Sequence, residues 1–224
     1  MKIAEVFYSV QGEGKLIGVP SVFVRTSGCN LRCKWCDTPY TSWNPEGEAR
    51  TVESLVDEVC AYRARHVVLT GGEPLLMKES IQLTKELKAR GMHITVETAG
   101  TVWSPVSCDL MSISPKLANS TPNDPYWGAL HERTRLQMEV LLRLMGEHEY
   151  QLKFVVAEPN DMSEILDLVG DLSAPAENVM LMPEGRSAEA IRAKAQWLVP
   201  LCLQHGFRFS PRVHIDIWGD KRGV

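Results

Sequence analysis

The chain has 224 residues, of which 44% are hydrophobic and 23% charged, and this composition excludes a disordered or fibrous protein. The formal net charge of -4 argues against general electrostatic binding to nucleic acid or to acidic membranes. No apolar leader follows Met1, and no later apolar run is long enough to span a bilayer, so we expect a cytoplasmic protein.

Short apolar runs along the chain predict buried strands. They lie at residues 22–26, 66–70, 93–97, 110–114, 152–157 and 178–182. Amphipathic stretches between the runs predict helices. One begins with Thr51 as its N-cap, one covers residues 81–87 and ends before Gly91, one covers residues 131–145, and two begin near Asn160 and Ser187.

Three segments have their own predictions. Residues 114–127 are rich in proline, asparagine and serine and predict a long loop over one end of the sheet. The helix that begins near Ser187 should bend or stop at Pro200, because proline lacks an amide hydrogen and clashes with the preceding turn. Residues from Val213 onward predict a last strand followed by a short tail.

Strands that alternate with helices predict right-handed crossovers and a mainly parallel α/β sheet. About six such units fit an incomplete (β/α) barrel better than a complete one, since the chain is short for eight units. We find no repeat, low-complexity tract or interdomain linker, so residues 1–224 are expected to form a single domain. In such a barrel the chemistry should lie at the C-terminal ends of the strands.

Three of the six cysteines are clustered in the loop after the strand at residues 22–26. Cys29, Cys33 and Cys36 have the spacing C-x3-C-x2-C, with Trp35 just before the last. Clustered thiols in a chain of this size indicate metal or redox chemistry rather than disulfides. A [4Fe–4S] cluster commonly takes four thiolates, so three would leave one iron free to bind a cofactor or substrate. The isolated Cys60, Cys108 and Cys202 are expected to be small buried hydrophobic residues.

A zinc site is the alternative interpretation of the three cysteines. Structural zinc sites normally combine two pairs of ligands, and no second Cys/His pair follows in this chain. Either His66 or Cys60 would have to supply the fourth ligand, although their spacing does not suggest it. This alternative stays open at the level of the residues alone.

A second motif, Thr70-Gly71-Gly72-Glu73-Pro74, follows the next predicted strand. Glycines at the end of a strand allow the backbone to approach a ligand closely. Together with the cysteine loop, the motif resembles the radical S-adenosylmethionine (SAM) superfamily. That resemblance implies that the open iron binds SAM and that the reduced cluster splits its sulfonium to give a 5′-deoxyadenosyl radical.

The resemblance becomes more specific over nearly the whole chain. The segments that resemble the 7-carboxy-7-deazaguanine synthase family are residues 5–14, 18–20, 23–25, 28–29, 36–38, 97–101, 114–116, 153–155 and 182–185. It implies a carbon–nitrogen lyase that converts 6-carboxy-5,6,7,8-tetrahydropterin to 7-carboxy-7-deazaguanine with loss of ammonia, on the route to 7-deazapurines such as queuosine. It also implies reversible use of SAM, dependence on Mg²⁺, a reductant such as flavodoxin or ferredoxin, and a homodimer.

The same resemblance implies the site residues. The predicted substrate contacts are Val10, Gln11, Gly12, Glu13, Arg25, Thr70 and His214. The predicted Mg²⁺ ligand is Thr38, and the predicted SAM contacts are Gly72, Ser114, Pro115, Lys116, Met182, Pro183, Glu184 and Gly185. The chemistry of the substrate agrees with part of this set, because an arginine fork such as that of Arg25 suits a carboxylate.

Two other functions share part of this sequence pattern. A glycyl-radical-enzyme activase has the same cluster loop, but it acts on a protein backbone and lacks the segment Gln11-Gly12-Glu13-Gly14 ahead of the cluster. A zinc or iron–sulfur binding module would need a fourth protein ligand and no Gly-Gly-Glu-Pro turn. The predicted function is therefore the synthase reaction.

Overall fold

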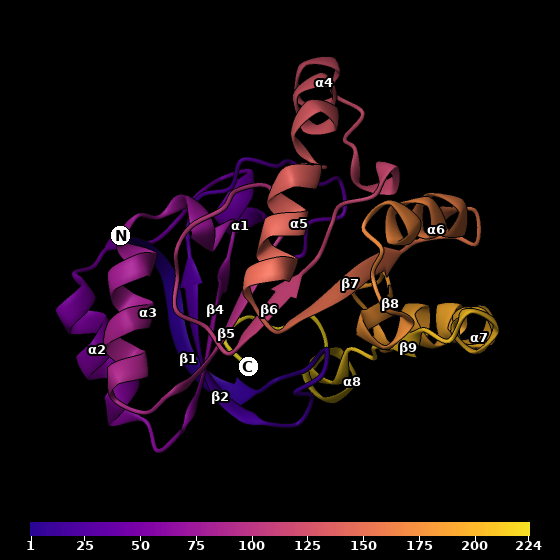
Figure 1. Cartoon of the computed structure of the whole chain (residues 1–224). Helices are drawn as coiled ribbons and strands as arrows, with labels where there is room; N and C mark the ends of the chain where they lie inside the picture. The colour runs from indigo at the N-terminus through magenta and orange to yellow at the C-terminus, as the bar shows by residue number, and fades with distance from the viewer.

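The computed structural model describes residues 1–224 and contains one nine-stranded sheet (Figure 1). The strands are β1 (Lys2–Val10), β2 (Pro20–Thr26), β3 (Glu48–Ala49), β4 (His66–Gly71), β5 (His93–Thr98), β6 (Leu110–Ile113), β7 (Tyr150–Val156), β8 (Val179–Pro183) and β9 (Arg208–Phe209). The helices are α1 (Pro39–Ser42), α2 (Val52–Ala61), α3 (Glu79–Ala89), α4 (Pro125–Thr134), α5 (Met138–Glu147), α6 (Asp161–Asp171), α7 (Ala188–His205) and α8 (Val213–Trp218). None of the helices has the length and apolar character needed to cross a membrane.

The sheet has the order β3-β1-β2-β4-β5-β6-β7-β8-β9. All neighbours from β2 to β9 are parallel, which confirms the predicted incomplete (β/α) barrel. The strands β1 and β3 add an antiparallel edge that the sequence reading did not anticipate. Most residues of β1 are only half buried, so its sequence lacks the apolar run that marks the inner strands.

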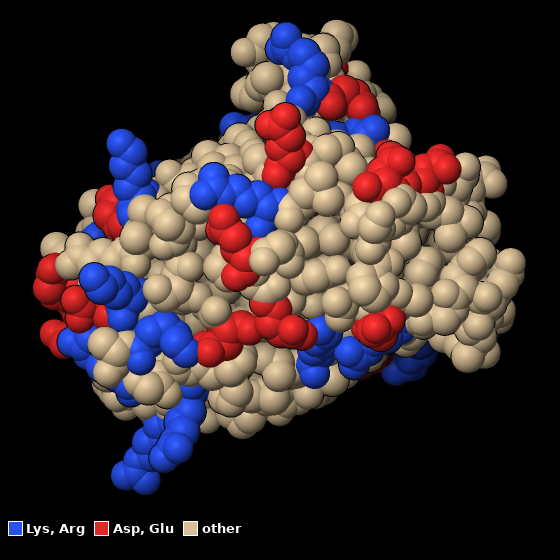
Figure 2. Space-filling view, in the orientation of Figure 1, with Lys and Arg blue, Asp and Glu red and all other residues tan.

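Each inner strand presents an apolar face to the helices and a more polar face to the barrel interior. In β7, Leu152, Phe154 and Val156 belong to the main hydrophobic core, whereas Gln151 and Lys153 point the other way. Helices α2 and α3 lie at one end of the row of strands and α6 and α7 at the other, with α5 between them (Figure 1). Lys/Arg and Asp/Glu intermix over the face shown in Figure 2, in keeping with the small net charge.

The loop between β1 and β2 enters the barrel interior. Its ends are joined by hydrogen bonds between Gln11 N and Val19 O (2.9 Å) and between Gly18 N and Gln11 O (2.7 Å). Gly14 has φ +75°, and a Cβ there would lie 2.3 Å from Gln151 Nε2, so only glycine fits. Lys15 N donates to Gln151 Oε1 (2.8 Å). The loop is thereby fixed at the base of the space enclosed by the strands.

Several predicted helices are confirmed at their ends. The side chain of Thr51 accepts from Ser54 N at the start of α2, and that of Ser187 accepts from Ala190 N at the start of α7. Residues 131–145, however, belong to two helices, because the chain turns between α4 and α5. The predicted loop at residues 114–127 is also shorter than expected, since α4 already begins at Pro125 with Asp124 as its cap.

The C-terminal part differs from the predictions in two places. Of the two outcomes predicted at Pro200, a bend or a stop, the stop does not occur: helix α7 continues to His205, where Gly206 ends it in the left-handed conformation. Its buried face and both caps outweigh the cost of about 3 kcal/mol for an internal proline. The segment from Val213 is helix α8 and not a strand; Ile215 is buried whereas Ile217 is exposed, so the apolar alternation did not mark a sheet face.

Candidate active site

A cavity of about 400 Å³ opens at the C-terminal ends of the parallel strands. Its wall includes most of the predicted site residues: Val10, Gln11, Gly12, Glu13, Arg25, Cys29, Cys33, Cys36, Thr38, Thr70, Gly72, Ser114, Lys116, Met182 and His214. Pro115, Pro183, Glu184 and Gly185 do not line it, although Glu184 and Gly185 border a small neighbouring pocket. The barrel therefore brings predicted site residues from the N-terminal and the C-terminal parts of the chain together around one cavity.

The cysteine loop is held from outside by polar contacts to its backbone. His131 Nδ1 accepts from Arg32 N (3.2 Å), Ser120 O accepts from Lys34 N (2.8 Å), and Trp43 Nε1 donates to Cys33 O (3.1 Å). These partners come from α4 and from the segments around it and around α1. The loop is thus fixed with its three thiols toward the cavity.

The three thiols suit a metal cluster. Burial raises the pKa of Cys29 to about 11 and that of Cys33 to about 12, so a metal that binds there must displace their protons. The small apolar cluster around them contains Leu31 and Ala99, which shield the position from water. The donor set fits an iron–sulfur cluster.

Neither of the two predicted candidates for a fourth protein ligand, His66 and Cys60, is placed to bind, and His131, which the structure brings to the cysteine loop, is already engaged. His131 is close, but its Nδ1 accepts from Arg32 N and its Nε2 lies 2.8 Å from Ser120 Oγ. His66 stands at the opposite end of β4 and stacks on His93. Cys60 is exposed on α2, which also corrects the expectation that it is buried. Cys202 is buried as expected, and Cys108 is half buried.

The glycine motif after β4 packs against the cysteine loop. A Cβ on Gly72 would lie 2.2 Å from Gly28 O and 2.9 Å from Cys29 Cβ. Gly72 N donates to Thr26 O (3.1 Å), and Glu73 N donates to Gly28 O (2.9 Å). The buried Glu73 carboxylate accepts from Thr98 Oγ1 and from the backbone of Ala99. The glycines therefore allow close approach of two backbone segments, and Glu73 ties them to β5.

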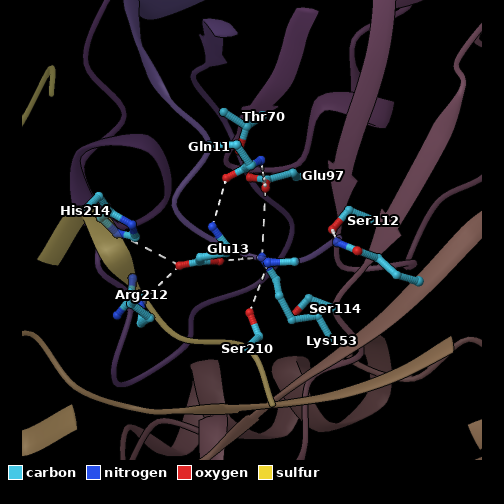
Figure 3. Close-up of polar contacts among 12 residues, drawn as sticks. Gln11, Glu13, Thr70, Glu97, Ser112, Ser114, Lys153, Ser210, Arg212 and His214 are labelled. Atoms are coloured by element: carbon cyan, nitrogen blue, oxygen red, sulfur yellow. Dashed lines mark hydrogen bonds and ion pairs between the residues drawn. The ribbon is translucent and has the colours of Figure 1, made fainter. Parts of the chain in front are cut away.

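Glu13 also lines the cavity and is the centre of a buried ionic network (Figure 3). One of its oxygens is paired with Lys153 Nζ and the other accepts from Arg212 Nε at 2.9 Å. Burial alone would raise the pKa of the Glu13 carboxyl, but Lys153 and Arg212 hold it far below its ordinary value. His214 Nε2 lies 3.9 Å from Glu13, and its ring packs directly on Gly12.

A second polar group lies beside this network. Gln11 Nε2 donates to Glu97 Oε1 (3.2 Å), and Thr70 Oγ1 donates to Glu97 Oε2 (2.9 Å). Lys153 Nζ also lies 3.8 Å from Glu97. Figure 3 shows Gln11, Thr70 and Glu97 together, on the same side of the site. These side chains present fixed acceptors and donors to the cavity.

Arg25 of β2 also lines the cavity. Its Nε donates to Glu5 Oε1 (2.6 Å), which also accepts from Tyr40 Oη (2.8 Å). The two terminal nitrogens of Arg25 have no hydrogen bond within the protein. Arg222 of the C-terminal tail pairs with the other Glu5 oxygen at 3.2 Å. The terminal nitrogens of Arg25, a residue of the cavity wall, are therefore not engaged by a protein acceptor.

The strand ends predicted to contact SAM are arranged as follows. Lys116 Nζ donates to Ser114 O (3.0 Å) and to Ser114 Oγ (2.8 Å). Met182 is at the cavity wall, whereas Glu184 is paired with Lys194 of α7. Gly185 O accepts from Arg212 Nη1 (2.6 Å).

The sequence reading did not single out Asp37, Lys153 and Arg212 as site residues. Lys153 carried a signal, because it interrupts the apolar run of β7 at a position that alternation directs inward. Arg212 carried none: it precedes a helix, and its partners lie far away in sequence.

Comparisons with known proteins agree with the geometry. The Radical SAM superfamily model matches residues 23–115, which hold the cysteine loop and the glycine motif. A 7-carboxy-7-deazaguanine synthase of Halobacterium salinarum is 45% identical over 98% of the chain and 91% of its own length. One of Rhodopirellula baltica is 45% identical over 99% of the chain and 88% of its own length. The crystal structure of QueE from Escherichia coli has a TM-score of 0.72 at 26% identity, covering 94% of this chain and 92% of that one. The chain belongs to the 7-carboxy-7-deazaguanine synthase family.

Proposed function

We propose that this protein is a radical SAM lyase that converts 6-carboxy-5,6,7,8-tetrahydropterin to 7-carboxy-7-deazaguanine and ammonia. The observation that carries the proposal is the single cavity whose one wall holds three cysteines and whose other wall holds Arg25 and the Glu13 network. The product named for the relatives has a carboxylate and a flat ring with N–H groups, which these two kinds of side chain suit.

Cys29, Cys33 and Cys36 would hold the [4Fe–4S] cluster. With SAM bound, the cluster supplies the reducing electron that starts radical chemistry. The residues proposed for SAM are Gly72, Ser114, Pro115, Lys116, Met182, Pro183, Glu184 and Gly185. Of these, Gly72, Ser114, Lys116 and Met182 line the cavity, which supports their assignment.

The substrate residues would orient the ring and exclude water from it. We assign the carboxylate to the open fork of Arg25, since two parallel N–H donors fit a carboxylate better than one point charge. Glu13 would accept from ring N–H groups, because Lys153 and Arg212 keep it ionised. Val10, Gln11, Gly12, Thr70 and His214 complete this proposed wall of the cavity.

We assign Mg²⁺ to Thr38, next to the cysteine loop. The Thr38 hydroxyl lines the cavity and lies 3.9 Å from Cys36 Sγ and 3.3 Å from Thr41 Oγ1. An oxygen ligand beside an incoming carboxylate suits a hard cation that keeps several waters.

Four further properties follow the resemblance and are proposed with it: a homodimer, a flavodoxin or ferredoxin as electron donor, a cytoplasmic location, and one domain spanning residues 1–224. The last is supported by a single sheet whose strands run from Lys2 to Phe209.

The test is turnover by protein that has been purified and reconstituted with iron and sulfide under anaerobic conditions. With SAM and a reductant, it should convert 6-carboxytetrahydropterin to 7-carboxy-7-deazaguanine and release one ammonia per product, faster with Mg²⁺ than without. A colourless zinc protein, or SAM cleavage that never yields the deazaguanine, would refute the proposal. A Thr38→Ala variant that keeps the Mg²⁺ response would remove that residue from the metal site.

A further inference from the structure

Arg212 lies where three loops of the cavity meet. Its Nε donates to Glu13 (2.9 Å), its Nη2 to Asp37 (2.7 Å) and its Nη1 to Gly185 O (2.6 Å). Only 6% of the residue is exposed, and each of its three nitrogens has a partner. Three of the five N–H donors of the guanidinium therefore hold protein groups, one on each nitrogen.

Each partner belongs to a different binding segment. Glu13 is in the loop that enters the barrel, Asp37 directly follows the last cluster cysteine and precedes Thr38, and Gly185 ends the proposed SAM segment. No direct hydrogen bond joins residues 11–19 to residues 28–43, so Arg212 is the polar link between the substrate loop and the cysteine loop.

The chemistry of the link requires arginine. Glu13 and Asp37 are both ionised, and without a cation between them the two carboxylates would repel each other. The planar fork of arginine reaches three acceptors in fixed directions, whereas a lysine ammonium acts as a compact point charge on a flexible stem. Lys153 already neutralises the other oxygen of Glu13, so Arg212 is needed for position rather than for charge alone.

We propose that Arg212 is a positioning residue that fixes the substrate loop relative to the cysteine loop, and so couples SAM cleavage to product formation. The inference rests on the proposed function. A radical reaction needs the reacting atoms in near contact, and a displacement of about 1 Å can cost on the order of a hundredfold in rate. All three hydrogen bonds of Arg212 go to protein acceptors, so its loss should misdirect the reaction more than it prevents SAM cleavage.

The test is the amount of 5′-deoxyadenosine that accumulates per deazaguanine formed, measured for Arg212→Met, Asp37→Ala and the double variant. Each single change should raise that ratio about tenfold, a size within the range of couplings inside one ion-pair network. The double variant should be no worse than Arg212→Met alone, because both changes break the same link. The inference would be overturned if the increase of the ratio in the double variant equalled the product of the two single increases. It would also be overturned if both single variants had the wild-type ratio.

Matched variants separate positioning from stability. Asp37→Asn keeps an oxygen acceptor for Arg212 and should restore most of the coupling lost in Asp37→Ala. Arg192→Met removes another arginine–aspartate contact to α8, but an exposed one, and should leave the ratio unchanged. Iron content and the cluster EPR signal should match wild type in all variants that are compared.

If Arg212→Met does not retain its cluster, Asp37→Ala and Asp37→Asn decide the matter, since the Asp37 side chain is 46% exposed and tolerates replacement. Equal ratios for these two variants and wild type would then reject the link. If the wild-type chain makes product but the Arg212 and Asp37 changes affect the ratio independently of each other, only the role of Arg212 is contradicted. A wild-type chain that makes no product removes the proposed function and this inference with it.

Discussion

The two walls of the cavity are built in different ways. The cysteine wall consists mainly of two segments from the first third of the chain, the cysteine loop and the glycine motif, which are fastened together by backbone hydrogen bonds such as Glu73 N to Gly28 O (2.9 Å). The ionic wall consists of charged side chains from both ends of the chain; Glu13 and Arg212 are 199 residues apart. The first wall is a local backbone structure, and the second exists only when the barrel has closed.

This difference predicts how each wall fails. A change on the cysteine wall alters backbone packing around the cluster and should remove SAM cleavage altogether. A change on the ionic wall strands a buried charge and should weaken or misplace the substrate while the cluster remains. A variant of the ionic wall that loses its cluster and SAM cleavage together with substrate binding would contradict this difference between the walls.

Cys33→Ala should have the largest effect. With only two thiolates left, the cluster loses a ligand that the structure does not replace, because His131 is engaged on both nitrogens. Iron content should fall, and SAM cleavage should be abolished. Cys60→Ala is the control, since that thiol is exposed on α2, and it should keep wild-type iron content and cleavage. Cleavage at the wild-type rate in Cys33→Ala would contradict the ligand assignment.

Gly72→Ala should have the second largest effect. The new Cβ would lie 2.2 Å from Gly28 O, a backbone atom that moves only with the cysteine loop. We expect poor cluster incorporation, measured as iron per chain and absorbance after reconstitution. Gly146→Ala is the matched control, because nothing lies within 4 Å of its Cβ and alanine is favoured in a helix. Full incorporation in Gly72→Ala would show that the two segments are not tightly coupled.

Arg25→Ala tests the ionic wall. Cluster content and SAM binding should stay at wild-type levels, while affinity for the carboxypterin should fall by about 2–4 kcal/mol, the scale for stranding a partner of a buried charge pair. Glu5 retains Tyr40 and Arg222 as partners, so folding should be little affected. Calorimetric titration of the oxidised protein measures the loss. Arg25→Lys should recover only part of it, and an unchanged affinity in Arg25→Ala would refute the assignment.

The smallest effect concerns acid stability. Burial lowers the pKa of His131 to about 4, and its Nδ1 must stay unprotonated to accept from Arg32 N. The unfolded chain, with a pKa near 6.5, binds more protons than the folded chain between about pH 6.5 and 4, so stability should fall as pH falls through that window. When the melting temperature is measured against pH for wild type and His131→Asn, it should fall less steeply with falling pH in the variant. Identical pH dependences would exclude His131 as a contributor to the loss of stability in acid.

The same difference between local and long-range contacts decides which parts of the fold and of the site could be predicted from the sequence. Spacing and alternation identified the parallel barrel, the cysteine loop and the glycine motif, because each depends on neighbouring residues. Helix α8 was misread, since its apolar alternation imitates a strand and only the finished fold shows that Ile217 faces solvent. Arg212 was missed for the same reason: its three partners come together only in the closed barrel.

The most direct test of the whole account is Mössbauer spectroscopy of protein reconstituted with ⁵⁷Fe, with and without SAM. Three protein thiolates on a four-iron cluster predict one iron that differs from the other three, and only its signal should shift when SAM is added. Four equivalent irons that do not respond to SAM would mean that a fourth side chain completes the cluster, and that Cys29, Cys33 and Cys36 do not leave a position for SAM.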